Sequence, residues 1–424
     1  MKQRNIIAAI DVGSNTITCI VGSDAGDNKI DILGHSMVVS AGVRRGIIIN
    51  VEEVALAIKA AIKKATLNIN VAIKKVYVNM AGHNIRTIEK SLSKSLNDSE
   101  TIQKSDIEHL LSQARNIPLS DDEKVYHVIN QSYSIDGEKG NHNPVGLTGS
   151  ELVVDYKLII GPKNYEEILR KSLQKAGVDM VKCVVNPIAA GEAVLNSEEK
   201  EAGVVLVDMG GGTTSISVYY DSVLRHLSII PFGGNVITND IREGCSIIAR
   251  QAEALKVKYG SAMGELVNDN MVVTIPGING WEPKEISFKN LAYIIQARME
   301  EIVESVFYQI VKSGYAEKLG AGIVLTGGGA KLNGIKNLVQ FKTGLSVRIG
   351  TPSNGLLNTN IEKAINTPQH ATAFGLLRKT LSDKNTQGNI FIERRPKKNI
   401  LPNYGEAIMN KISIFFDEVS DDEL

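Results

Sequence analysis

The clearest pattern of apolar and polar positions lies at Val204–Tyr219. The apolar run Val204–Met209 is interrupted only by Asp208, three glycines follow, and Ser215–Val218 then alternates between polar and apolar residues. A short apolar run predicts a buried strand, and the alternation predicts a second strand beside it. Consecutive glycines let the backbone approach a ligand, and their N–H groups can form a concave anion site. A hairpin turn with nothing bound is the alternative for this stretch taken alone.

The same order of residues occurs near the start of the chain, where Ala9–Val21 aligns with Leu206–Val218 without a gap. The equivalent positions are Asp11 and Asp208, Gly13 and Gly210, and Thr16 and Thr213. A third glycine cluster, Gly327–Gly329, follows another apolar run, and none of the three clusters has the spacing of a Walker loop or of GxGxxG. The repeat predicts two related halves whose turns face one phosphate chain. The two aspartates are then placed to hold Mg²⁺ through water.

The spacing of apolar residues predicts most of the remaining elements, and a chain of 424 residues suggests two or more domains. The predicted strands are Lys29–Ser40, Val76–Ala81, Lys124–Ser134, Leu152–Ile160 and Met271–Ile275. The predicted helices are Val51–Asn68, Ser105–Arg115, Tyr165–Ala176, Asn186–Leu195, Cys245–Lys258 and Phe288–Lys312. Asn186–Leu195 and Ala371–Leu377 are rich in small residues, which predicts a close approach of two helices at a hinge between the halves.

The pattern changes after Leu381. Residues 382–403 contain few apolar side chains and include a basic cluster, which predicts a flexible linker. From Tyr404 to Val419 the apolar residues fall on one arc of a helix, so an amphipathic helix lying in the membrane interface is predicted. Its membrane-facing residues would be Ile408, Met409, Ile412, Phe415 and Phe416. The tail that follows is acidic, which anionic lipid would repel, so docking on protein is the alternative.

The overall composition argues against several classes of function. The 47 basic and 47 acidic residues balance, whereas a nucleic-acid-binding protein usually has a basic domain or stripe. The three cysteines lie singly with no CxxC pair, which indicates thiols in a reducing compartment. The seven histidines show no metal-ligand spacing, and no apolar run is long enough to span a membrane.

The three glycine clusters resemble the phosphate-1, phosphate-2 and adenosine motifs of the actin, hexokinase and DnaK-type chaperone superfamily. More narrowly, the chain resembles the FtsA family of bacterial cell-division proteins. The segments that carry this narrower resemblance are Asn143–Gly149, Gly203–Tyr219, Ile229–Ile241, Ala252–Gly260 and Ala321–Ile335. The resemblance implies an α/β protein with the actin-like, ribonuclease-H-like two-domain ATPase fold, an inserted small α/β subdomain and a C-terminal amphipathic helix.

The resemblance also implies how the chain is divided. The first nucleotide-binding subdomain would comprise residues 1–82, 161–195 and 362–381, with the inserted interaction subdomain at 83–160. The second nucleotide-binding subdomain would comprise residues 196–235 and 296–361. Residues 236–295 would form a small lobe that receives the FtsZ peptide. The linker at 382–403 and the membrane-targeting helix with its tail at 404–424 would follow. An inserted lobe without binding function is the alternative for 83–160.

ATP and Mg²⁺ are the cofactors that the resemblance implies. The ATP-binding residues would be Asp11, Gly13, Ser14, Asn15, Thr16, Asp208, Gly210, Gly211, Gly212, Thr213, Thr214, Glu253, Lys256, Gly327, Gly328, Gly329 and Lys331. Asp11 and Asp208 would hold the metal through water. Glu253 and Lys256 share a helix face, and on spacing alone a surface ion pair is the alternative.

Hydrolysis is expected to be slow. The helix Asn186–Leu195 contains no glutamine, which actin uses at the matching helix, and Glu192 is its candidate base. The nucleotide would therefore act mainly as a switch of conformation and polymerisation.

The resemblance implies four kinds of partner: the C-terminal peptide of FtsZ, further copies of the chain in a head-to-tail filament, other division proteins and membrane lipid, but no nucleic acid. The location would be the cytoplasmic side of the inner membrane at the division septum. Arg298, expected at the start of a long helix, would contact the FtsZ peptide. Two alternatives remain, a phosphotransferase such as a sugar kinase or exopolyphosphatase, and a binding-only scaffold like the actin-like proteins of pilus assembly.

Overall fold

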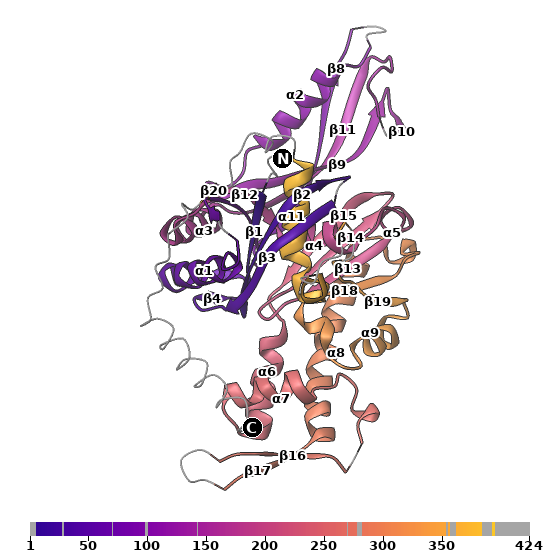
Figure 1. Cartoon of the computed structure of the whole chain (residues 1–424). Coiled ribbons are helices and arrows are strands. Elements are labelled where there is room, and N and C mark those ends of the chain that lie inside the picture. Colours follow the sequence, from indigo (N-terminus) through magenta and orange to yellow (C-terminus); the bar gives the residue numbers. More distant parts are fainter. Residues whose placement is uncertain are drawn as a thin grey trace.

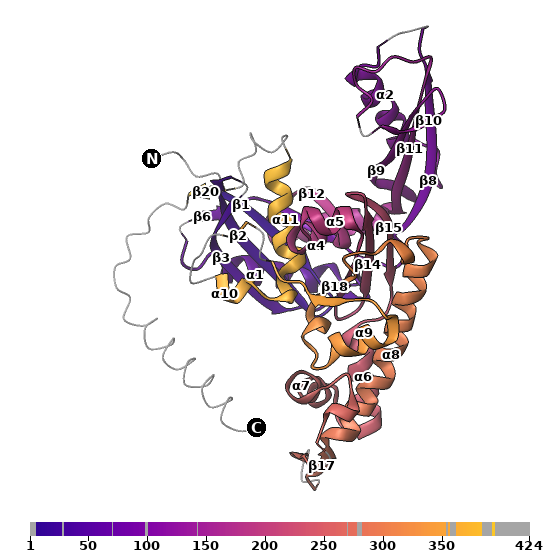
Figure 2. The same ribbon diagram turned by 90° about the vertical axis from the view of Figure 1, so that its right-hand side faces the viewer.

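The computed structural model describes residues 6–27, 29–69, 71–97, 101–141, 143–268, 270–277, 282–352, 355–356, 362–383 and 392–394. Two five-stranded sheets form the centre of the molecule, and an inserted lobe and a small lobe extend it at opposite ends (Figures 1 and 2). No helix among these residues has the length and apolar character needed to cross a bilayer.

The first sheet has the strand order β12-β7-β1-β2-β3. Its strands are β1 (Ile6–Val12), β2 (Thr16–Gly26), β3 (Lys29–Val39), β7 (Lys75–Met80) and β12 (Asp179–Val185). Alternate side chains of β1 are buried on opposite faces: Ala8 and Ile10 pack with α1 (Val51–Ala65) and α3 (Lys163–Ala176), whereas Ala9 packs toward α11 (Ala371–Ser382). Burial on both faces explains why this strand is an almost unbroken apolar run.

The second sheet repeats this arrangement with the order β15-β14-β13-β18-β19. Its strands are β13 (Val204–Met209), β14 (Thr214–Tyr220), β15 (Val223–Ile230), β18 (Ile323–Thr326) and β19 (Val347–Ile349). The register is also repeated, because Asp11 pairs with Thr18 and Asp208 pairs with Ser215. Helices α8 (Phe288–Lys312) and α9 (Ile335–Thr343) pack on the outer face. The internal repeat predicted from the sequence is therefore a repeat of structure.

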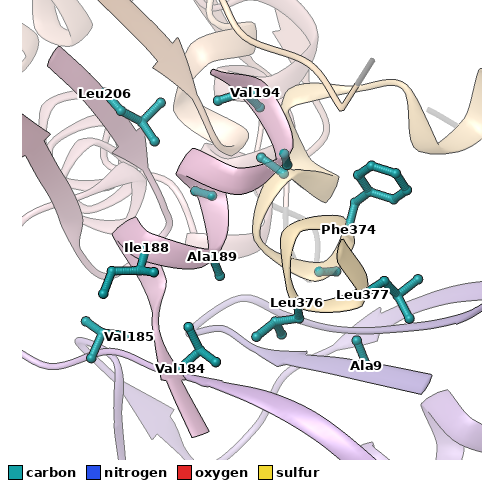
Figure 3. Packing of buried hydrophobic residues seen from close by; sticks show 14 of the residues in the cluster. Ala9, Val184, Val185, Ile188, Ala189, Val194, Leu206, Phe374, Leu376 and Leu377 are labelled. Carbon is teal, nitrogen blue, oxygen red and sulfur yellow. The ribbon is translucent and has the colours of Figure 1, made fainter. Parts of the chain in front are cut away.

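Helices α4 (Asn186–Val194) and α11 cross between the two sheets, and both belong to one buried cluster with residues of each sheet (Figure 3). Their backbones touch, because a Cβ atom on Gly375 would overlap the carbonyl oxygen of Ala189. On α4, a Cβ atom on Gly191 would lie 2.7 Å from the hydroxyl of Tyr219. The close approach predicted from small residues is therefore observed at both helices.

The inserted lobe is a four-stranded antiparallel sheet with the order β10-β9-β11-β8 and α2 (Lys104–Arg115) against one face. Its strands are β8 (Arg86–Ser95), β9 (Glu123–Ile135), β10 (Glu138–Asn141) and β11 (Glu151–Pro162). The sequence did not predict β8, because this strand is mostly polar and exposed. Arg225 on β15 joins the lobe to the second half, since its Nη1 donates to the carbonyl of Gln131 at 3.0 Å.

The small lobe contains α6 (Gly234–Cys245), α7 (Ala249–Tyr259), β16 (Val272–Ile275) and β17 (Lys284–Ser287). The prediction of a single helix over Cys245–Lys258 was wrong at its start. Cys245 is the last residue of α6, Ser246 adopts a left-handed conformation at φ 51°, and α7 begins at Ala249. The prediction missed α6 and also β17.

Short elements complete the described chain: β4 (Val43–Arg44), β5 (Ile47–Ile48), β6 (Val71–Ile73), α5 (Ser197–Ala202), α10 (Glu362–Ile365), β20 (Ile392–Arg394) and four 3-10 turns at Gly264–Leu266, Ala316–Lys318, Gly328–Lys331 and Pro368–His370.

Two short parts of the predicted flexible linker, 382–403, lie among the described residues, namely 382–383 and 392–394. Ser382 is the last residue of α11, and Asp383 accepts hydrogen bonds from Tyr77 Oη at 3.0 Å and Lys182 Nζ at 2.6 Å. Strand β20 then pairs antiparallel with β6, and β6 directly precedes β7 of the first sheet along the chain. The predicted membrane helix at 404–424 lies outside the described residues.

Candidate functional site

A cavity of about 420 Å³ lies between the two halves, within the size range of small-molecule sites. The glycine clusters of both halves line it, together with residues from α7, the start of α4 and the start of α11. Of the residues predicted to bind ATP, the cavity lining includes Asp11, Gly13, Ser14, Asn15, Thr16, Asp208, Gly210, Gly211, Gly212, Thr213, Thr214, Glu253, Lys256, Gly327, Gly328, Gly329 and Lys331. The fold thus brings these predicted positions together.

The first and second glycine loops have the same backbone conformation. The N–H of Gly13 donates to the carbonyl of Thr16 at 3.0 Å, and the N–H of Gly210 donates to the carbonyl of Thr213 at 2.9 Å. A Cβ atom would lie 2.9 Å from the Thr16 oxygen in the first loop and 3.0 Å from the Thr213 oxygen in the second. Both turns therefore need glycine at the same point.

The two loops also contact one another. A Cβ atom on Gly211 would overlap the side chain of Asn15, and one on Gly212 would overlap the hydroxyl of Ser14. Glycine at these positions lets the backbone of the second loop lie directly against polar side chains of the first. The result is a surface of main-chain and hydroxyl groups suited to an anion.

Asp11 and Asp208 end equivalent strands and line the cavity from opposite halves. Burial raises the pKa of the Asp11 carboxyl to about 7, and the neighbouring charge of Asp208 adds to the rise. Burial raises the pKa of Asp208 to about 6, and a hydrogen bond from Thr372 Oγ1 at 3.1 Å partly offsets this. Two carboxyl groups with raised pKa values at one cavity form a site that a cation would stabilise.

The third cluster and α7 form the other end of the cavity. Gly327 has φ 80° and lies so close to Asp208 that a Cβ atom would overlap the carboxylate. Lys256 Nζ donates to Glu253 Oε2 at 2.6 Å and to the carbonyl of Gly234 at 2.9 Å. Lys331 Nζ donates to Gln369 Oε1 at 3.2 Å. The Glu253–Lys256 pair is therefore part of the cavity wall rather than an isolated surface ion pair.

Two asparagines, one that lines the cavity and one bonded to it, were not predicted from the sequence. Asn79, buried at the end of β7, accepts from the N–H of Val12 at 2.6 Å and donates from Nδ2 to Asn186 Oδ1 at 2.8 Å. Asn186, the first residue of α4, lines the cavity. A polar residue within the apolar strand Lys75–Met80 was the signal available in the sequence.

Two other predicted residues lie elsewhere. Glu192 is not among the described residues that line the cavity, and its carboxylate lies 4.0 Å from Lys200 Nζ. Arg298 is in the interior of α8, not at its start. Its guanidinium binds both carboxylate oxygens of Asp240, at 2.6 and 3.0 Å, and also Glu301 at 2.6 Å.

Known proteins share both the fold and the sequence pattern. Residues 205–375 match the family model described as cell division protein FtsA, and residues 82–160 match the model of the SHS2 domain inserted in FtsA. The cell division protein FtsA of Neisseria meningitidis serogroup B is 33% identical over 377 residues, which cover 89% of this chain and 90% of the relative.

Among solved structures, the PilM–PilN type IV pilus biogenesis complex superposes with a TM-score of 0.60 at 14% identity, covering 88% of this chain and 98% of that one. MreB5 of Spiroplasma citri, in a structure bound to ADP, superposes with a TM-score of 0.51 at 14% identity, covering 89% and 99%. At these identities the likeness concerns the fold.

The duplicated sheets, the crossing helices and the cavity between the halves define a protein of the actin-like ATPase fold with an inserted SHS2 domain. The relative from Neisseria extends over nearly the whole chain and both family models match. The chain belongs to the FtsA family of cell division proteins. The family resemblance and the predicted actin-like fold with its inserted subdomain are confirmed, whereas the C-terminal helix of that prediction lies outside the described residues.

Proposed function

We propose that this protein binds ATP with Mg²⁺ in the cavity between its halves and tethers the FtsZ ring to the inner face of the cytoplasmic membrane at the division septum. It forms head-to-tail filaments and recruits later division proteins through the inserted lobe. One observation carries the nucleotide part of the proposal. Two equivalent glycine loops and two carboxyl groups, one of each from either half, meet at a single cavity.

The residues at the cavity fit a magnesium-bound triphosphate. Gly211 and Gly212 let the second loop lie against Asn15 and Ser14 of the first, so main-chain and hydroxyl donors of both loops line one cavity where phosphate oxygens would bind. Asp11 and Asp208 would hold Mg²⁺ through water, and oxygen donors of this kind suit that ion. When bound, the metal would neutralise phosphate charge. At the other end, Glu253 and Lys256 would contact the ribose and adenine beside Gly327–Gly329.

Slow hydrolysis is expected because α4 presents Asn186, and no carboxylate, to the cavity. The Asn186 side chain accepts a hydrogen bond from Asn79, and a neutral amide cannot accept the proton of an attacking water molecule. Glu192 lies beside Lys200 instead. The amide of Asn186 can orient water but not activate it, so bound ATP persists and acts as a switch of conformation and polymerisation.

The small lobe is the proposed site for the C-terminal peptide of FtsZ. It exposes several large apolar side chains: Ile248, Leu266, Met271, Val272 and Tyr293. Arg298 would contribute positive charge there, but it must exchange its bonds to Asp240 and Glu301 for bonds to an acidic peptide. For the membrane tether we propose the amphipathic segment with Ile408, Met409, Ile412, Phe415 and Phe416.

Calorimetric titration and a single-turnover assay test the nucleotide site. We expect one Mg-ATP to bind per chain, much more weakly when Mg²⁺ is removed, and turnover below about 0.01 s⁻¹ because α4 presents Asn186 and no carboxylate to the cavity. Transfer of phosphate to a small-molecule acceptor would support a phosphotransferase instead. ATP that is bound but never turned over would support a binding-only scaffold.

A further inference from the structure

The hairpin formed by β4 and β5 contacts both glycine loops at the edge of the cavity. The N–H of Gly46 donates to Ser14 Oγ at 3.0 Å, which joins the hairpin to the first loop. The α-carbon of Arg45 lies 3.0 Å from the position of a Cβ atom on Gly212, which places it against the second loop. The start of α6 contacts that loop elsewhere, because Gly234 N–H donates to the carbonyl of Gly210 at 2.9 Å. The hairpin thus contacts the first loop through Gly46 and the second through Arg45.

The backbone of this hairpin is held in place. The N–H groups of Ile49 and Asn50 both donate to the carbonyl of Gly42, at 2.8 and 3.1 Å, and a Cβ atom on Gly46 would lie 2.8 Å from that of Ala81. Arg45 itself has φ 50°, in the left-handed region that residues other than glycine rarely adopt. Such conformations persist where the surrounding structure imposes them, and they cluster at ligand sites. The fold therefore fixes the position of the Arg45 α-carbon, from which the side chain extends.

The charged side chains that line the cavity carry no net formal charge that would offset a triphosphate. Among the described residues, three acidic side chains and three lysines line it, namely Asp11, Asp208, Glu253, Lys256, Lys258 and Lys331, so their formal charges cancel. Lys256 is bonded to Glu253 and Lys331 to Gln369, so neither is available without giving up a partner, and Lys258 Nζ lies over the ring of Tyr259, 5.2 Å from its centroid. Arg45 is exposed, and its side chain has no hydrogen bond or ion pair with any part of the chain that the structure describes.

We propose that Arg45 binds the terminal phosphate of the bound nucleotide and makes the site select a triphosphate over a diphosphate. This inference rests on the proposed binding of ATP at the two loops. A guanidinium group offers a planar set of donors that matches phosphate oxygens, and such charge-assisted bonds are stronger than neutral ones. The Arg45 residue is exposed, so a bond to the terminal phosphate would hold its side chain against the two loops.

The test compares dissociation constants for ADP and for a non-hydrolysable ATP analogue, both with Mg²⁺, in full-length variants. Arg45→Asn removes the charge while keeping a residue that tolerates positive φ, and Arg45→Lys keeps the charge. The matched control is Arg44→Asn on the neighbouring, exposed position of the hairpin. We expect Arg45→Asn to weaken binding of the analogue roughly 10-fold or more and to leave ADP within about twofold. Arg45→Lys should recover part of the loss, and Arg44→Asn should change neither constant.

An unchanged ratio of the two constants in Arg45→Asn overturns the inference. So does an equal loss for both nucleotides, because the hairpin would then support the loops without reading the terminal phosphate. If the unaltered protein binds neither nucleotide, the proposed ATP site itself is wrong, and that result is distinct from a wild-type protein that binds both while Arg45 has no effect.

Discussion

The substitution Asp208→Asn is expected to abolish tight binding of Mg-ATP and, at the same time, to stabilise the nucleotide-free protein. The amide keeps an acceptor for Thr372 Oγ1 but loses the charge that would hold the metal's water. We expect the dissociation constant for Mg-ATP to rise at least about 100-fold, equivalent to roughly 3 kcal/mol. Calorimetric titration with Mg-ATP measures this loss directly.

The gain in stability has a defined pH dependence. The folded-state pKa of Asp208 is raised to about 6 from an ordinary value of 3.8, so the folded protein holds a proton that the unfolded chain has released. Stability of the nucleotide-free protein therefore falls as pH rises from about 4 through 6, and the full cost is present above 6. Asp208→Asn removes this cost, which we expect to add about 3 kcal/mol at pH 7.5 and almost nothing at pH 4.

Urea unfolding without nucleotide at the two pH values measures the difference. Asp221→Asn, the same change at an exposed turn, is the matched control and should affect neither stability nor nucleotide affinity strongly. Retention of Mg-ATP affinity within threefold in Asp208→Asn would show that this carboxylate does not serve the metal.

Replacing Gly375 by alanine is expected to destabilise the protein, although alanine ordinarily stabilises a helix interior relative to glycine by about 1 kcal/mol. A Cβ atom at this position of α11 would overlap the carbonyl oxygen of Ala189 on α4, and backbone atoms cannot rotate away as a side chain can. The two helices must separate, which we expect to cost about 2 to 3 kcal/mol or more. Thermal unfolding monitored by circular dichroism measures the expected fall in the unfolding temperature.

The control for this substitution is Gly244→Ala in α6, where the new Cβ atom would meet only the tip of the Ile294 side chain at 2.9 Å. A flexible side chain can move by that amount, so the control should lie close to the unaltered protein. If Gly375→Ala proves as stable as Gly244→Ala, the α4–α11 contact is not a fixed hinge.

The sequence predicted the two glycine loops because their geometry depends on local pattern. Each loop consists of an apolar strand, an aspartate and a glycine whose position is set by a hydrogen bond three residues on, as between Gly210 and Thr213. Duplication of that pattern also predicted the two halves, since equal patterns gave equal registers at Asp11 and Asp208.

The parts that were not predicted depend on contacts between distant segments. Asn79 becomes a site residue only because β7 ends beside α4 and meets Asn186. The direction of Glu192 depends on which face of α4 packs toward Tyr219, and a short helix of small residues does not indicate that face. Similarly, the pairing of β20 with β6 joins segments more than three hundred residues apart, which no local periodicity records.

Recruitment of FtsZ to lipid vesicles tests the central claim most directly. Purified FtsZ is sedimented with anionic vesicles and Mg-ATP in the presence of either the full chain or a chain truncated after Lys398. The account predicts that FtsZ pellets with vesicles only when the full chain is present, because the small lobe would bind FtsZ and the terminal segment would bind lipid. Equal recruitment by both chains, or by neither while the full chain still binds Mg-ATP, would contradict the proposed tether.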